Sequence, residues 1–319
     1  MHMDRRKFLK FSAMSAALAA LGGVPPTVEE RDGMPYRVLG ATGEHVSLLG
    51  IGGAHIGRNP MSDDEAVRAM RKAVDAGVNF FDNAYIYENG RSEERMGKAL
   101  QDGYRDQVFL MTKFYSTERD AAAAKQQLEE SLRRLQTDVI DLWQVHQIYG
   151  ADHPRLVYEN DLPEVMEEAR REGKVRYTGF TGHSRPEYHA EMIERGYAWD
   201  TVQMPLNPFD HHWESFEHTI LPMALERDMG VIGMKSLGGT PGQIVNNSGA
   251  LSARECIHYA MNLPVSTVVL GMERPELLDE DIAIAKEFRP LEEDEVRDIL
   301  AKAEEDALTG EYETYKERV

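Results

Sequence analysis

Four residues that can carry protons or charge stand at or just beyond the ends of short apolar runs. Asp82 directly follows one run and Tyr87 comes five residues later, while Lys113 lies near the end of a second run and His146 closes a third. Runs of this length are typical of buried strands. Because α/β folds carry their chemistry at the carboxyl ends of parallel strands, we expect the four side chains to meet at one edge of a sheet.

Together these side chains could protonate a carbonyl oxygen. A phenol has a pKa near 10, so Tyr87 alone is a reluctant proton donor at neutral pH, and the Lys113 ammonium would lower that pKa. Asp82 would keep Lys113 charged, and His146 could hydrogen-bond the substrate oxygen. Each residue alone also has an ordinary explanation, as a turn cap, a surface aromatic, a lysine reaching out of the core or a core histidine. Their joint spacing favours general acid catalysis.

The residues around this constellation resemble the aldo-keto reductase family. The resemblance rests on residues 79–100 (NFFDNAYIYENGRSEERMGKAL), on MTK at 111–113 and on DLWQVH at 141–146, and it continues over roughly residues 36–289. It implies a (β/α)8 TIM barrel that uses the four residues above as its catalytic set, with reduced NAD(P)H as the hydride donor. Tyr85, the nearest competitor for the role of acid, does not match the family's spacing.

The resemblance also implies where an extended nicotinamide nucleotide would bind. Thr181 can replace a serine hydroxyl that the family uses, but Gly182 stands where the family has an asparagine amide, and His183 is the candidate substitute. Gln203 matches the family's other carboxamide contact, and Met234 takes the place of a stacking aromatic. The implied contact residues are Gly53, Thr181, Gly182, His183, Gln203, Met234, Lys235, Ser236, Leu237, Gly238, Gly271, Glu273, Arg274, Glu280 and Asp281.

The choice between NADP and NAD depends on the segment after the eighth strand. Arg274 could clamp a ribose 2′-phosphate, whereas the neighbouring Glu273 would repel one. Leu277 stands where the family often has a basic residue, and Glu280 would face the adenine. Lys235, after the seventh strand, would suit the pyrophosphate. We expect NADP(H) from the family's habit, with NAD(H) as the alternative.

Apolar runs alternate with helical patterns along the rest of the chain. With a first strand at 48–52 the count is about eight, which favours a closed parallel barrel. No G-x-G-x-x-G follows a strand, which argues against a Rossmann domain. Segments 36–38 and 46–48 predict an N-terminal β-hairpin. The expected divisions are an export signal at 1–23, a linker at 24–35, the barrel at 36–290, and an extra C-terminal helix with a tail at 291–319.

Composition narrows the function classes further. The chain has 319 residues, 42% of them apolar, which suits one barrel of about 250 residues. Its formal charge of −19 would repel nucleic acids and anionic lipids, and the single Cys256 excludes an intramolecular disulfide. Arg5 and Arg6 precede a short Ala-rich apolar run, which resembles a twin-arginine signal and is too short to span a bilayer. We therefore expect export to the periplasm or beyond, with the export machinery as a partner and no stable membrane span.

The expected substrate is a small or medium carbonyl compound, with sugars among the candidates. Two alternatives stay open. The missing asparagine at position 182 and the Met234 in place of a stacking aromatic favour a nicotinamide-binding accessory or sensor protein with little turnover. Export favours an enzyme that recycles its bound cofactor internally, as an epimerase or dehydratase would. The histidine-rich run at 210–218 lacks a complete ligand set, so it indicates a solvated loop and helix start, and no metal is expected.

Overall fold

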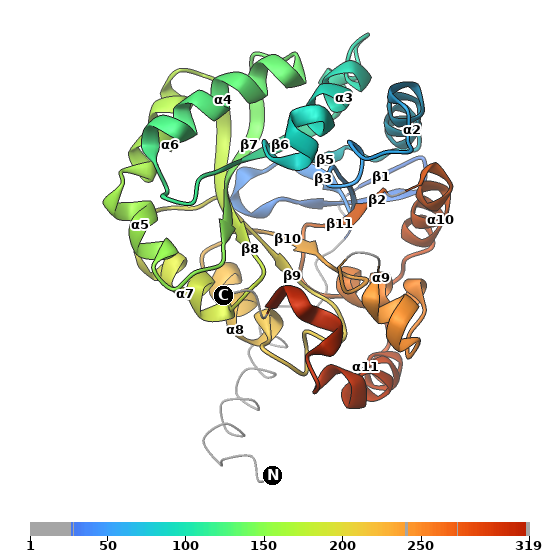
Figure 1. The fold of residues 1–319 in the computed structure, drawn as a ribbon. Coiled ribbons are helices and arrows are strands. Elements are labelled where there is room, and N and C mark those ends of the chain that lie inside the picture. Colours follow the sequence, from blue (N-terminus) through green and yellow to red (C-terminus); the bar gives the residue numbers. More distant parts are fainter. Residues whose placement is uncertain (1–26, 28, 240–241, 273, 317–319) are drawn as a thin grey trace.

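Eight parallel strands close into a barrel in this computed structural model, which describes residues 27, 29–239, 242–272 and 274–316. The strands follow one another round the barrel in chain order, and the last, β11, pairs with the first, β4 (Figure 1). They are β4 (Leu49–Gly52), β5 (Phe80–Asp82), β6 (Phe109–Tyr115), β7 (Ile140–Ile148), β8 (Val175–Gly182), β9 (Thr201–Pro205), β10 (Gly230–Met234) and β11 (Thr267–Gly271). The predicted (β/α)8 fold is confirmed.

Helices surround the barrel on its outer side (Figure 1). They are α2 (Asp63–Asp75), α3 (Arg91–Ala99), α4 (Ala121–Leu135), α5 (His153–Glu159), α6 (Leu162–Arg171), α7 (Pro186–Glu194), α8 (Phe216–Leu225), α9 (Ala253–Asn262), α10 (Pro275–Lys286) and α11 (Glu293–Ala307). Local hydrogen bonds fix the start of α2, where Ser62 and Glu65 form a reciprocal capping box. Among the described residues, none of the helices is both long enough and apolar enough to cross a bilayer.

Side chains along each strand point alternately outward and inward, so the barrel has two hydrophobic cores, one under the helices and one in its interior. Phe114 points outward and packs on Trp143, with ring centroids 4.7 Å apart, beneath the surrounding helices. The inward side chains form a second cluster that fills the barrel interior, namely Leu39, Val46, Phe80, Phe109, Met111, Leu142, Ile232 and Val269. Since inward positions recur every second residue, Asp82 follows Phe80 inward, and Lys113 follows Met111. The polar groups therefore lie above an apolar plug, at the carboxyl ends of the strands.

The N-terminal sheet has one strand more than the predicted hairpin. β2 (Met34–Val38) and β3 (His45–Ser47) form that hairpin, but β1 (Glu29–Arg31) also pairs with β2. Part of the expected linker at 24–35 is therefore a strand. The reason is local: Asp32 and Gly33 both have positive φ, 50° and 78°, as the Asp-Gly turn of a tight hairpin requires.

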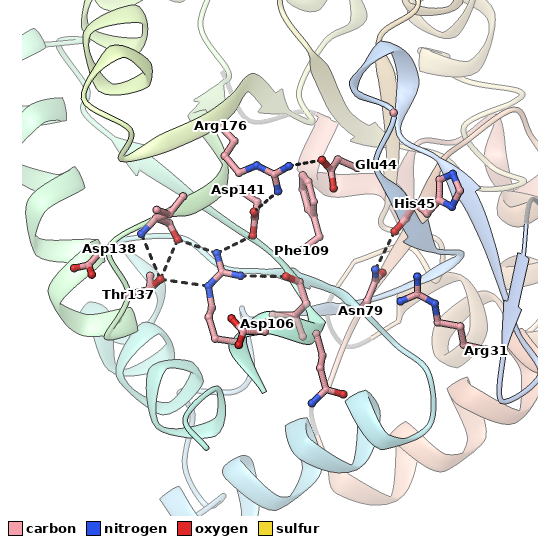
Figure 2. Close-up of a pocket in the computed structure, with 15 residues that line it drawn as sticks. Arg31, Glu44, His45, Asn79, Asp106, Phe109, Thr137, Asp138, Asp141 and Arg176 are labelled. Atoms are coloured by element: carbon pink, nitrogen blue, oxygen red, sulfur yellow. Dashed lines mark hydrogen bonds and ion pairs between the residues drawn. The ribbon is translucent and has the colours of Figure 1, made fainter. Parts of the chain in front are cut away.

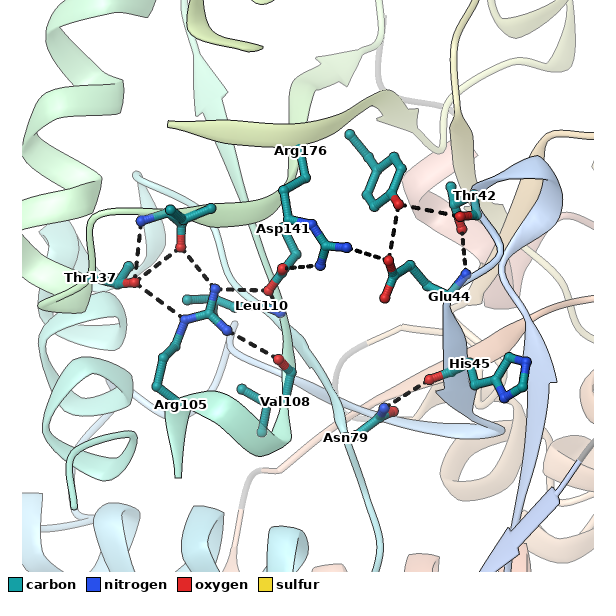
Figure 3. Close-up of polar contacts among 12 residues, drawn as sticks. Thr42, Glu44, His45, Asn79, Arg105, Val108, Leu110, Thr137, Asp141 and Arg176 are labelled. Atoms are coloured by element: carbon teal, nitrogen blue, oxygen red, sulfur yellow. Dashed lines mark hydrogen bonds and ion pairs between the residues drawn. The ribbon is translucent and has the colours of Figure 1, made fainter. Parts of the chain in front are cut away.

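A cavity of about 700 Å³ lies at the amino-terminal end of the barrel strands, opposite the four predicted catalytic residues. Figure 2 shows its lining, and Figure 3 the polar network that crosses it. Asp141 is 5% exposed and binds Arg105 at 2.8 Å and Arg176 at 2.7 Å, and Arg176 continues to Glu44 of the N-terminal sheet. The charges in this network compensate one another. We therefore interpret it as a seal that fixes the closed end of the barrel.

The C-terminal segment, as far as Lys316, folds onto the opposite, carboxyl end of the barrel. After α11, the 3₁₀ segment η5 (Glu311–Lys316) buries Lys316 completely between the carboxylates of Asp210 and Glu313, at 2.7 and 2.9 Å. The Lys316 ammonium also donates to the carbonyl oxygen of Trp213. This segment therefore caps the barrel at the end where the chemistry is expected.

Candidate active site

Two strand ends supply a buried ion pair. Asp82 is the last residue of β5, and Lys113 lies on the neighbouring strand β6. The Lys113 ammonium donates to Asp82 and, at 2.8 Å, to the backbone carbonyl oxygen of Asn83. Both side chains are almost fully buried, so each charge depends on the other for compensation. Gln203, in the middle of β9, donates to the second carboxylate oxygen of Asp82 at 2.9 Å.

Tyr87 and His146 complete the predicted set of four. Tyr87 opens the 3₁₀ turn after β5, and the centroid of its ring lies 5.2 Å from the Lys113 ammonium. Its ring meets the His146 ring edge-on, with centroids 5.7 Å apart. His146 projects from β7 and is 7% exposed. The structure therefore brings all four residues together at one end of the barrel, as the spacing predicts.

Burial sets the protonation states of the two aromatic groups. Burial raises the pKa of Tyr87, and Asp82 adds to this, so that both outweigh the lowering effect of Lys113. Lys113 lowers this pKa as expected, but burial is the larger effect, so the phenol keeps its proton at neutral pH. Burial also lowers the pKa of His146 well below its usual range, with a further contribution from Lys113. His146 is consequently a neutral imidazole at pH 7.

Tyr85 takes no part in this cluster. Its hydroxyl donates to Glu130 of α4 at 2.8 Å, and the guanidinium of Arg134 lies 4.5 Å from its ring centroid. Tyr115 is nearer: it lies 6.3 Å from the His146 ring, and its hydroxyl is 3.3 Å from that of Tyr149. This tyrosine pair is a candidate for one rim of the substrate site.

The residues implied as carboxamide contacts lie on β8 and β9. Thr181 is 2% exposed and Gly182 follows it at the end of β8. A side chain at position 182 would overlap the backbone carbonyl oxygen of Ile148 on β7, which explains why the family's asparagine is missing there. The buried oxygen Oε1 of Gln203 has no hydrogen-bond partner within the described part of the chain. Such an orphaned acceptor fits an amide N–H of a bound nucleotide.

The loop after β10 carries a second group of implied contacts. Met234 ends the strand, and Lys235 follows with a positive φ of 60°. Ser236 is 1% exposed, and its hydroxyl oxygen finds no partner among the described residues. Leu237 is partly buried, and the Gly238 N–H closes a turn onto the Lys235 carbonyl oxygen at 2.8 Å. The loop thus presents a cation beside a buried hydroxyl.

The remaining implied contacts lie on or beyond strand ends. Gly53 allows close approach: its N–H donates to the Asp82 carbonyl oxygen, and a Cβ there would come within 2.7 Å of that oxygen. At Gly271 a side chain would overlap His55. Arg274 is exposed just before α10, which carries Glu280 and Asp281. Burial and the neighbouring Glu280 raise the pKa of Asp281 to about 7. Glu273 lies outside the described residues.

Two neighbours of the site escaped the sequence reasoning. Arg119 is fully buried and donates to the backbone carbonyl oxygens of His146, at 2.8 Å, and Gln147. Tyr315, in the C-terminal segment, places its carbonyl oxygen 3.1 Å from Nδ1 of His183. Neither could be predicted, because Arg119 lies in an unremarkable charged loop, and only the fold brings Tyr315 near β8. For Tyr315, the only available signal in the sequence was that the acidic C-terminal segment is rich in aromatic residues.

Comparison with known proteins places this geometry in a family. The Aldo/keto reductase family model matches residues 48–244, which is more than half of the chain. The chain belongs to the aldo/keto reductase family. As a member it is an oxidoreductase, and the resemblance read from residues 79–100 is confirmed. A twin-arginine translocation pathway signal sequence matches residues 2–22 and indicates export across a membrane.

Several curated aldo/keto reductases and sugar oxidoreductases are similar to the chain. L-galactose dehydrogenase of Arabidopsis thaliana is 27% identical over 291 residues, covering 80% of this chain and 89% of that protein. The 6-dehydroglucose reductase of Novosphingobium aromaticivorans is 29% identical, covering 64% of this chain and 69% of that protein. Aldo-keto reductase YhdN of Bacillus subtilis is 33% identical over 60% of this chain, but the match spans only 58% of its length.

Solved structures share the barrel. The holo form of aldo-keto reductase AKR11C1 from Bacillus halodurans superposes with a TM-score of 0.70 at 25% identity, covering 85% of this chain and 96% of that one. An aldo/keto reductase from Klebsiella pneumoniae, solved in complex with NADP and acetate, has a TM-score of 0.67 at 23% identity, covering 84% and 95%. At that identity the second likeness supports the fold alone.

Proposed function

We propose that this oxidoreductase reduces aldehydes or ketones to alcohols with NADPH, and that Tyr87 is the general acid. The observation that carries the proposal is the position of Lys113, whose buried ammonium interacts with both Asp82 and Tyr87. A phenol beside a buried ammonium can give up its proton without leaving an isolated charge in the barrel. The phenolate that forms is paired with the ammonium from the start.

Each residue of the four has one task. Tyr87 donates its proton to the carbonyl oxygen of the substrate as that oxygen becomes an alkoxide. Neutral His146 donates an N–H hydrogen bond to the same oxygen and orients it, while Asp82 keeps Lys113 charged. Proton donation of this kind contributes about 10²–10⁴-fold to the rate. Fixed donors aimed at the developing negative charge add to it, because they need no reorganisation during the reaction.

The described residues fit a nicotinamide nucleotide, which when bound supplies the hydride that is added to the carbonyl carbon. Gln203 and Ser236 each offer a buried polar atom that lacks a partner in the described chain, and Lys235 lies in the same loop as Ser236. Gln203 would hold the carboxamide, and the loop would hold the phosphates. Arg274 is exposed at the start of α10 and can pair with a 2′-phosphate. This favours NADP(H), with NAD(H) as the alternative.

Sugars and sugar-derived carbonyl compounds are the proposed substrate class. Two relatives carry sugar names, L-galactose dehydrogenase and 6-dehydroglucose reductase. The rim of the site suits a polyol, because the Tyr115 ring lies 6.3 Å from the His146 ring and the hydroxyl groups of Tyr115 and Tyr149 are 3.3 Å apart. Phenol hydroxyls can both donate to and accept from sugar hydroxyl groups. After folded export, the enzyme would act in the periplasm or outside the cell.

A substrate panel tests this function. The purified protein is mixed with NADPH or NADH and with hexose-derived aldehydes and ketones, and nicotinamide oxidation is followed by its absorbance. We expect NADPH oxidation that saturates with sugar carbonyls. Arg274→Ala should raise the KM for NADPH and leave the KM for NADH unchanged. Nucleotide binding without oxidation across the whole panel would contradict the proposal and favour an accessory or sensor protein.

A second candidate function is favoured by the C-terminal segment. The Tyr315 carbonyl oxygen lies against His183, and the Lys235 ammonium is 5.7 Å from the Tyr315 ring centroid. This segment thus touches two residues assigned to the nucleotide, which would slow nucleotide exchange and suit an enzyme that recycles its cofactor internally. Mass spectrometry of the exported protein separates the two: a stoichiometric bound nucleotide favours internal recycling, and empty protein that turns over added NADPH favours the reductase.

A further inference from the structure

Three side chains with metal-binding atoms converge on the loop between β9 and α8. His211, Glu217 and His218 each offer one ligand atom, and the three atoms lie within 4.8 Å of one another. Nδ1 of His211 is 2.9 Å from the Glu217 carboxylate. The His211 and His218 rings are edge-on, with centroids 4.3 Å apart. Glu217, at the second position of α8, is the carboxylate that faces His211.

The surroundings of this cluster are protected rather than solvated. Glu217 is only 5% exposed, and the two histidines are partly buried. The expectation of a solvated loop and helix start is therefore wrong for these residues. The hydroxyl of Tyr259, from α9, donates to Glu217 at 2.7 Å and lies 3.2 Å from Nδ1 of His211. A hydrogen-bonded phenol behind a carboxylate is the kind of outer partner that orients a metal ligand.

We propose that His211, Glu217 and His218 bind one zinc-class divalent transition metal ion per chain. Two imidazoles and a carboxylate are the donors that such ions prefer. Ligand atoms about 2.1 Å from a tetrahedral ion lie about 3.4 Å apart. The His211–Glu217 pair therefore needs to open by only a few tenths of an ångström, with loss of the proton between them. Three protein ligands leave one position for water.

The place of the site in the fold assigns it a structural role. The carboxylate of the adjacent Asp210 accepts the N–H groups of Phe216 and Glu217, at 3.1 and 2.9 Å, and also pairs with Lys316 of the C-terminal segment. A metal ion would therefore fix the loop to which the end of the chain is anchored. The four proposed catalytic residues, on β5, β6 and β7 and in the turn after β5, take no part in this site. The inference is therefore independent of the proposed reaction.

Zinc titration of the full-length, untagged protein tests the proposal. The protein is treated with a chelator, freed of it, and titrated with ZnCl₂ by calorimetry, with MgCl₂ as the hard-cation control. We expect one zinc per chain, a zinc-dependent rise in Tm, and no response to magnesium. His211→Gln and His218→Gln should each weaken zinc binding by more than about a hundredfold, and Tyr259→Phe by about tenfold to a hundredfold.

His212→Gln is the matched control. His212 lies in the same peptide and its ring meets the His211 ring edge-on at 5.1 Å, but its Nε2 is used by the Leu300 carbonyl oxygen, 3.0 Å away. Its replacement should leave zinc affinity unchanged. Tm values measured without zinc show whether each variant folds. The proposal is overturned if wild type shows no saturable binding of one zinc per chain, or if folded His211→Gln and His218→Gln proteins bind zinc as tightly as wild type does.

Discussion

Lys113 and Asp82 form an ion pair inside the barrel, and their side chains are only 2% and 6% exposed. Burial alone would lower the pKa of Lys113, but Asp82 and Tyr87 together outweigh it, and the net shift is upward. The ammonium is therefore held charged next to Tyr87 across the physiological range. The neighbouring strands β5 and β6 fix this relation, because Asp82 pairs in register with Met111, two residues before Lys113.

Asp82→Asn should weaken catalysis most at high pH. Without the carboxylate, the pKa of Lys113 falls, so the lysine loses its charge at a lower pH than in wild type. We expect kcat/KM to fall on the order of 10²-fold at neutral pH and its alkaline limb to move to lower pH. A pH profile of kcat/KM measures both. An unshifted alkaline limb would mean that Asp82 does not control the charge of Lys113.

The pH profile of the reduction rate should show no inflection from His146 near pH 6.5. Burial, with Lys113 adding to it, holds the pKa of His146 well below its usual value, so the imidazole is neutral over the whole neutral range. Reduction by the wild-type protein should then be flat through pH 6.5, where a free histidine titrates. His146→Gln, which keeps a donor group, should lower kcat without introducing a new inflection. A wild-type inflection near pH 6.5 would indicate a protonated histidine as the acid.

Lys316→Met should destabilise the protein. The change leaves the carboxylates of Asp210 and Glu313 buried without their cation, and breaking a buried pair costs about 3–5 kcal/mol. Denaturant unfolding measures the loss. Lys302→Met is the matched control, because its ion pair with Glu255 lies on the surface, and it should change the unfolding midpoint little. Equal midpoints for the two variants would contradict a buried anchor.

Asp141→Asn should lower stability and spare catalysis. The Asp141 carboxylate accepts hydrogen bonds from Arg105, Arg176 and the Leu110 N–H (Figure 3), at the end of the barrel opposite the four proposed catalytic residues. Loss of charge-assisted hydrogen bonds costs about 2 kcal/mol. We expect a Tm lower by a few degrees with kcat/KM unchanged below that temperature. Asp106→Asn, at an exposed position of the same cavity, should alter neither quantity.

The sequence predicts the barrel well because its signals are local. Each apolar run is one strand, and the first strand, expected at 48–52, is β4 (Leu49–Gly52). The same alternation predicts which end of the barrel holds Asp82, Lys113 and His146. The strand β1 was missed, although the Asp-Gly turn that forms it is a local signal.

What the sequence did not predict depends on contacts between distant segments. Lys316 is buried only because the chain returns to Asp210, and Glu217 faces His211 only because the loop after β9 folds back on itself. The pKa of Tyr87 rises because burial outweighs Lys113, and burial depends on the complete fold. Such effects follow from tertiary packing and have no counterpart in residue spacing.

Single-turnover oxidation of bound NADPH tests the central claim most directly. The wild type, Tyr87→Phe and Tyr85→Phe are each loaded with NADPH and mixed with saturating aldehyde in a stopped-flow spectrometer. If Tyr87 is the proton donor, Tyr87→Phe binds NADPH normally but oxidises it at least about 10²-fold more slowly, while Tyr85→Phe keeps the wild-type rate. A Tyr87→Phe protein that oxidises bound NADPH as fast as wild type would contradict the account.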